Sequence, residues 1–152
     1  SNLRRGKEMK RTAARELAFQ LIYSLEVQKI DAEERKEGLA LFLENNEIEE
    51  KQVIQYITDA VEGITKNEDE IAELIASNLK EGWELSRVSK INIAILKLAV
   101  YEMVFQKLPY KVVINEGVEL AKNYGDDDSK AFVNGILASI VKQLNLAQTT
   151  EE

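Results

Sequence analysis

The chain has 152 residues and a mass of 17.2 kDa, enough for one ordinary domain or two very small ones. Its hydrophobic fraction of 45% is high enough to offset the entropy cost of folding, so we expect a globular protein. The sequence contains no Cys and no His, which excludes disulfides, cysteine nucleophiles, and sites built on imidazole or thiolate groups. One Pro, seven Gly and many helix-forming residues predict a mostly helical protein.

The net charge of −7 is unevenly distributed along the chain. Residues 1–15 carry six basic side chains and one acidic side chain, a local balance of +5, so the remaining residues sum to −12. A basic N-terminal arm on an acidic body suits binding to a polyanion such as nucleic acid. A solvated tail that keeps the protein in solution would have the same composition.

The sequence shows no sign of export or membrane insertion. Its first residues lack the apolar segment of a secretory signal, and no stretch reaches the roughly 18 apolar residues that span a bilayer. We therefore expect a cytoplasmic protein with no membrane partner. The first two residues resemble the remnant of a cloning tag, and Met9 is a candidate natural start. The resulting division has three parts: a basic arm at 1–9 that includes any tag residues, a helical domain at 10–146, and a C-terminal tail at 147–152.

The first part of the chain predicts three helices. Apolar residues spaced three and four apart indicate a helix over 12–29, with Thr12 as its N-cap. A shorter helix fits 32–43 and is closed by the turn pair Asn45 and Asn46. An apolar stripe over 53–64 predicts the third helix.

Two further helices follow. Asn67, with Glu70 three residues later, is typical of a capping box, and we expect the helix that it starts to end at Gly82. The segment 91–105 is apolar on nearly all sides, so this helix should be central and buried.

The last two helices begin at Pro109 and near Ser129. Pro109 suits a helix entry because of its fixed φ, and the helix should run to Gly125. Ser129 is the expected cap of the last helix, in which Gly135 costs about 1 kcal/mol relative to Ala. A helix tolerates such a glycine for close packing or for approach of a ligand to its backbone. Seven helices without a convincing strand predict an all-α fold.

The first predicted helix carries a candidate site for single-stranded RNA. Arg11 and Arg15 lie four residues apart and share one surface with Phe19 and Ile22. A guanidinium group neutralises phosphate, and an aromatic ring stacks on a base. The alternative is that Phe19 belongs to the core and that the arginines pair with nearby glutamates.

Acidic residues offer weaker candidates. The run Asp126 to Asp128 does not fit a calcium loop, because Lys130 occupies the third ligand position; these carboxylates instead favour the start of a helix. Glu116 and Glu119 could form an acid–base pair, but carboxylates are so common in this sequence that a solvated helix face is the favoured interpretation. No phosphate-binding glycine loop or nucleophile elbow occurs. We therefore expect no metal, no cofactor and no enzymatic activity.

Five segments in fixed order together resemble the NusB family of transcription antitermination factors. They are 15–23 (RELAFQLIY), 95–102 (ILKLAVYE), 109–116 (PYKVVINE), 119–122 (ELAK) and 129–137 (SKAFVNGIL). The resemblance covers the chain from about Met9 to Leu144.

This resemblance implies two packed three-helix subdomains in a cytoplasmic bacterial protein. It implies binding of the boxA RNA element together with NusE, a ribosomal protein of the small subunit. It also implies assembly with RNA polymerase and other Nus factors during ribosomal RNA transcription, and it is compatible with a homodimer. Two alternatives stay open: an RNA-binding domain related to ribosomal RNA cytosine methyltransferases but without their catalytic domain, and a purely structural helical oligomer.

The resemblance also implies binding roles for individual residues of this chain. Those expected to contact RNA are Lys10, Arg11, Arg15, Asp128, Ser129, Lys130 and Phe132. Tyr23 and Asn92 are expected to contact NusE. Asn92 stands where relatives often carry an acid, so its bond to a basic partner would lack the strength of a charge-assisted one.

Overall fold

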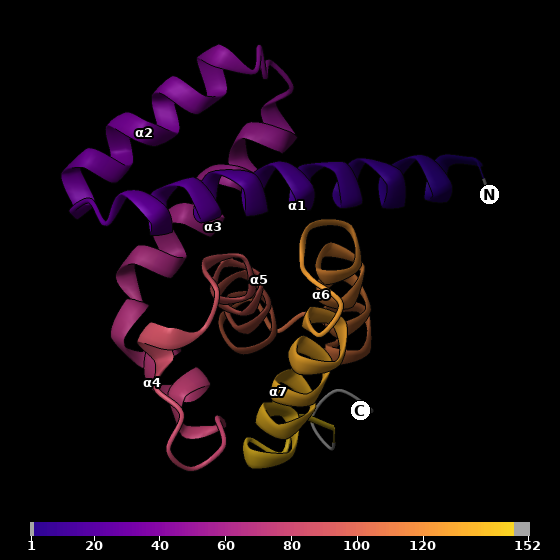
Figure 1. Ribbon diagram of the computed structural model, residues 1–152. Helices are drawn as coiled ribbons and strands as arrows, with labels where there is room; N and C mark the ends of the chain where they lie inside the picture. Colours follow the sequence, from indigo (N-terminus) through magenta and orange to yellow (C-terminus); the bar gives the residue numbers. More distant parts are fainter. Residues whose placement is uncertain (1, 148–152) are drawn as a thin grey trace. The chain divides into compact units, whose positions relative to one another are not determined.

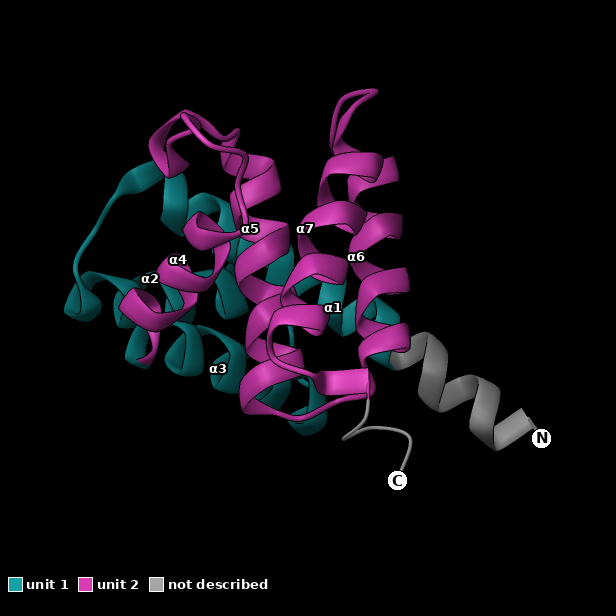
Figure 2. Cartoon of the chain, turned by 90° about the horizontal axis from the view of Figure 1, so that it is seen from below, with its two compact units in different colours: residues 1–66 teal, residues 67–152 magenta. Residues whose placement is uncertain are grey.

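A computed structural model describes residues 2–147, and the side chains of residues 11–147. The described residues form seven α-helices and contain no strand, as predicted (Figure 1). The chain divides into two compact units, residues 1–66 and 67–152, which are coloured separately in Figure 2. No described helix is long and apolar enough to cross a bilayer.

The first unit contains three helices: α1 (Asn2–Gln28), α2 (Ala32–Asn45) and α3 (Lys51–Lys66). α1 packs against α3, and α2 contacts both. Buried apolar side chains come mainly from α1 and α3, and they include Ala18, Leu21, Leu25, Leu39, Ile57, Ala60, Val61 and Ile64. The apolar stripes of the sequence therefore form the core of this unit.

The ends of these helices agree only partly with the sequence patterns. The prediction of Thr12 as an N-cap is wrong, because α1 already begins at Asn2. No Pro precedes Thr12, and most of the residues before it are helix formers, so nothing stops the helix from extending N-terminally. α2 runs to Asn45, two residues past the predicted end, and Asn46 is its C-cap, so only Asn46 of the predicted turn pair lies in the turn. Its N-cap is Asp31, whose side chain accepts a hydrogen bond from the Glu34 N–H at 2.9 Å.

The second unit is built around one buried helix. α5 (Lys90–Val100) packs against α4 (Glu68–Ser77), α6 (Tyr110–Tyr124) and α7 (Ser129–Gln143). Every residue from Asn92 to Val100 is buried, which confirms the prediction of a central helix. The predicted segment does not stay α-helical to its end, since it closes with one π-helical turn, η2 (Tyr101–Phe105), in which the Gln106 N–H donates to the Tyr101 carbonyl at 3.1 Å.

Two helix ends in the second unit differ from the sequence predictions. α4 ends at Ser77 with Asn78 as its C-cap, so the prediction that Gly82 ends it is wrong. Gly82 instead has φ 85° in a tight turn, where the Trp83 N–H donates to the Lys80 carbonyl at 2.9 Å, ahead of the short η1 (Leu85–Arg87). Asn67 is the N-cap of α4, but its side chain does not make the expected capping bond.

The last two helices start close to the predicted places. Pro109 is the N-cap of α6, which runs to Tyr124 and is followed by Gly125. The prediction of Ser129 as a cap is wrong by one residue, because Asp128 is the N-cap and Ser129 is the first helical residue of α7.

Candidate nucleic-acid interface

The candidate cations of α1 differ in exposure. Arg11 is exposed, whereas Arg15 retains only 5% of its accessible surface. A step of four residues rotates a side chain by about 40° around an α-helix, and here that rotation carries Arg15 to the edge of the face that includes Ala14 and Ala18. Lys10 lies outside the residues whose side chains are described.

The aromatic side of α1 belongs to the core. Phe19 is 2% exposed and Ile22 is 4% exposed, on a helix that packs against α3. The Phe19 ring stacks on the half-buried ring of Tyr23, with centroids 6.4 Å apart and planes inclined by 23°. The alternative in which Phe19 is a core residue is therefore confirmed. The Phe19 ring is not exposed beside Arg11 and cannot stack on a base there.

Hydrogen bonds fix the turn that joins α6 to α7. The Ser129 hydroxyl accepts a bond from the Asp126 N–H at 3.0 Å and donates one to Asp126 Oδ1 at 3.1 Å. The same Oδ1 accepts a bond from the Asp128 N–H at 2.9 Å. Ser129 is 1% exposed, so its hydroxyl holds the turn and does not lie on the surface.

Gly125 is required for this turn. A Cβ atom at Gly125 would lie 2.4 Å from both the Cβ and the Oγ of Ser129, and 2.8 Å from the Ala121 carbonyl oxygen. These separations are far shorter than van der Waals contact. The absence of a side chain at Gly125 therefore allows the Ser129 hydroxyl to approach Asp126.

The fixed turn presents a short polar and aromatic surface at the start of α7. Asp128 and Lys130 are exposed and Phe132 is half-buried. Asn134 and Gly135 are exposed on the same helix, and a Cβ at Gly135 would meet nothing within 4 Å. Close packing therefore does not explain Gly135, which leaves approach of a ligand to the backbone as the remaining sequence-based interpretation.

Asn92 lies near the start of α5, where Ser89 is the N-cap. The Asn92 N–H donates to the Ser89 hydroxyl at 3.2 Å, so the backbone at this position is satisfied. The Asn92 side chain is 8% exposed, and its Oδ1 has no hydrogen-bond donor among the described residues. A buried carbonyl oxygen without a donor costs about 1 to 3 kcal/mol, which a donor from a partner would offset.

Two buried charged residues, Lys97 and Glu102, were not assigned a role from the sequence. Lys97 is 5% exposed in α5, and its Nζ lies 3.4 Å from Oε1 of Glu68 at the start of α4. A lone basic residue inside an apolar helix is the signal that could have indicated this pair, because a buried ammonium group needs a charged or polar partner. The pair connects α4 to the central helix.

Comparisons with known proteins identify relatives of this chain. The model of the NusB family matches residues 12–142. The transcription antitermination protein NusB of Acetivibrio thermocellus is 47% identical over 135 residues, which cover 88% of this chain and 90% of that protein.

Solved structures agree in fold. NusB of T. maritima superposes with a TM-score of 0.79 at 34% identity, over 88% of this chain and 91% of that chain. A chain from a crystal structure of the antitermination factors NusB and NusE in complex with dsRNA superposes with a TM-score of 0.78 at 26% identity, over 89% of this chain and 98% of that chain. With matches of this extent in both sequence and fold, the chain belongs to the NusB family.

Proposed function

We propose that this protein is an RNA-binding transcription antitermination factor that binds boxA RNA together with NusE. It acts with RNA polymerase and other Nus factors in ribosomal RNA transcription, in the cytoplasm and without catalytic activity of its own. The observation that carries this proposal is the similarity in fold to the complex of NusB and NusE with dsRNA. The surfaces of both units supply side chains suited to these ligands.

The first unit contributes cations to RNA binding. Arg11 is exposed and can neutralise a phosphate, and Lys10 adds to the same basic arm. Arg15 is largely buried, so its guanidinium acts at the edge of this surface and also interacts with other groups of the chain. Electrostatic contacts of this kind give affinity without sequence preference.

The second unit contributes the start of α7. Lys130 offers a cation, and the half-buried ring of Phe132 offers a surface on which an unpaired base can stack. The Asp128 carboxylate can accept hydrogen bonds from the base edges or from the 2′-hydroxyl groups that distinguish RNA. Ser129 contributes by holding the turn that orients these three side chains.

Tyr23 and Asn92 are the proposed contacts to NusE. Tyr23 keeps part of its ring accessible while it stacks on Phe19. Asn92 offers an acceptor oxygen that no donor in the described part of the chain reaches, which suits a Lys or Arg of a basic ribosomal protein. The acidic balance of the chain outside its arm also favours such a partner.

A binding experiment across a salt series tests this proposal. Affinity for a boxA-type single-stranded RNA is measured with and without NusE, beside a scrambled RNA of equal length. We expect NusE to raise the affinity for boxA by about 5- to 150-fold, equivalent to about 1 to 3 kcal/mol of coupling. We also expect the affinity to fall steeply with salt. Equal affinity with and without NusE, or no preference for boxA, would contradict the proposal.

A further inference from the structure

A pocket of about 450 Å³ lies within the first unit and is not used by the proposed function. It is formed by the middle of α1, by the connection between α2 and α3, and by Val53 in the first turn of α3. Its apolar floor consists of Ala13, Ala14, Leu17, Ile48 and Val53. The volume falls in the range of about 300 to 1,000 Å³ that is usual for ligand sites.

The floor of the pocket is open to solvent. Leu17, Ile48 and Val53 are only half-buried, and Ala13 is exposed. Their apolar atoms therefore remain in contact with water, and covering them with an apolar side chain is favourable. A ligand for this pocket should carry at least one aliphatic or aromatic group.

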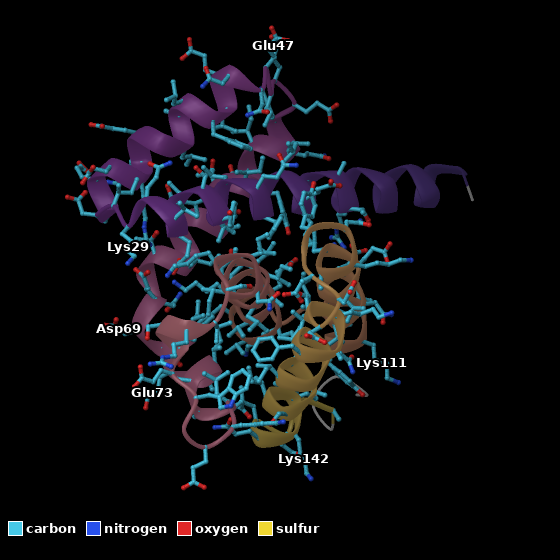
Figure 3. All side chains as sticks on the ribbon, viewed as in Figure 1. Lys29, Glu47, Asp69, Glu73, Lys111 and Lys142 are labelled. Carbon is cyan, nitrogen blue, oxygen red and sulfur yellow. The ribbon has the colours of Figure 1, made fainter. Side chains whose placement is uncertain are left out.

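The rim of the pocket is acidic. Glu47, Glu49 and Glu50 line it, and all three are exposed. Figure 3 shows Glu47 pointing outward from the connection between α2 and α3. Three carboxylates within four residues repel phosphate groups, so this rim disfavours RNA and favours a cationic ligand.

Backbone hydrogen bonds fix the rim. The Ile48 N–H donates to the Leu43 carbonyl at 3.0 Å, and the Glu47 N–H donates to the Glu44 carbonyl at 3.0 Å. Glu47 has φ 51°, so the end of α2 forms a Schellman motif with a glutamate in its left-handed position. The apolar Ile48 and the acidic Glu47 are thereby held next to each other.

We propose that this pocket docks a basic amphipathic segment of a partner protein. An aliphatic or aromatic side chain of the segment enters the apolar floor, and lysines or arginines beside it pair with the carboxylates of Glu47 and Glu49. Charge complementarity is the argument for this occupant. It also excludes residues 148–152 as the occupant, because their charged members, Glu151 and Glu152, are acidic.

A synthetic peptide tests the assignment on the full chain. The probe is a short labelled helix-forming peptide with leucines on one face and lysines on the other, and its matched control has glutamate in place of every lysine. We expect the lysine peptide to bind saturably, with an affinity that falls as salt rises, and the glutamate peptide not to bind. Binding of both peptides, or of neither, would overturn the proposal.

Variants of the chain test whether the peptide binds in the pocket. Glu47→Gln combined with Glu49→Gln should weaken lysine-peptide binding about fivefold at low salt, because two exposed ion pairs are lost. Ala13→Leu should weaken it about tenfold without changing its salt dependence, since the larger side chain occupies the floor and leucine suits a helix. Glu62→Gln, on the exposed part of α3 and not in the pocket, is the matched control and should bind like the unmodified chain.

The same variants distinguish this proposal from two alternatives: binding of the peptide elsewhere on the chain, and occupation of the pocket by a second copy of the chain. Thermal unfolding should be unchanged in all of them, and boxA binding should be unaffected by the paired glutamate changes. Peptide affinity equal to that of the unmodified chain in both pocket variants would show that the peptide binds elsewhere. If light scattering without peptide shows a salt-sensitive dimer that the glutamate changes abolish, a second copy occupies the pocket and the partner assignment is wrong.

Discussion

Ser129 and Asn92 are two buried polar residues near helix starts in the second unit, and they differ in how their side chains are satisfied. At the start of α7, the Ser129 hydroxyl accepts a hydrogen bond from the Asp126 N–H and donates one to Asp126 Oδ1. The Asn92 Oδ1 at the start of α5 has no donor among the residues described. Burial alone therefore does not separate a structural residue from a binding residue.

Whether a buried side chain has its hydrogen bonds satisfied distinguishes a structural residue from a binding residue. A satisfied buried group stabilises the fold, and its loss should act on folding first. An unsatisfied buried acceptor destabilises the free chain and gains when a partner supplies a donor. We therefore propose that Ser129 holds the turn of the RNA surface and that Asn92 binds the partner, and four predictions test this contrast and the surfaces to which the two residues belong.

Gly125→Ala should have the largest effect. A Cβ at this position would overlap with Ser129, so we expect a loss of about 2 to 3 kcal/mol in the free energy of unfolding, measured with urea. Gly135→Ala is the matched control, and there the open space should allow a gain of up to about 1 kcal/mol. Similar stability changes in both variants would show that the turn is not sterically fixed.

Phe132→Leu should lower RNA affinity by about tenfold in the presence of NusE. Stacking of one base on an aromatic ring contributes about 1 to 3 kcal/mol, and leucine keeps an apolar side chain at this half-buried position. The slope of affinity against salt should stay the same, because no charge changes. A flattened slope or an unchanged affinity would argue against stacking by Phe132.

Asn92→Asp and Asn92→Leu should change the affinity for NusE in opposite directions. The carboxylate should raise affinity for NusE about fivefold through a charge-assisted bond, and leucine should lower it. In the chain without NusE, leucine should instead raise the free energy of unfolding by about 1 kcal/mol, because the unsatisfied oxygen is removed. Calorimetric titration and urea unfolding measure the two effects, and equal NusE affinity in both variants would exclude this contact.

Arg11→Gln should have the smallest effect. Arg11 is exposed, so we expect about a threefold loss of RNA affinity, no change in thermal unfolding, and a slope against salt that is smaller by about 0.7. Lys142→Gln, an exposed change in the last turn of α7 that is labelled in Figure 3, is the control. An equal decrease of the slope in both variants would indicate a general effect of net charge.

Helix ends show where sequence reasoning was reliable and where it was not. Asn46 and Pro109 mark ends as predicted, because a turn-forming amide and a fixed φ act locally. Thr12 and Gly82 do not, because a capping residue takes effect only where the neighbouring residues stop the helix. The π-helical turn at the end of the central segment also had no signal in the apolar pattern.

The sequence by itself determined the all-α fold, the buried central helix and the basic arm, since composition and spacing are local properties of the chain. Its matching segments carried the resemblance to the NusB family. Only the tertiary structure decided that Phe19 and Ser129 are buried, that the oxygen of Asn92 meets no donor from residues 11–147, and that an apolar pocket has an acidic rim. Spacing along a helix shows which residues share a face. What that face meets depends on packing against other helices, which brings together residues far apart in the sequence.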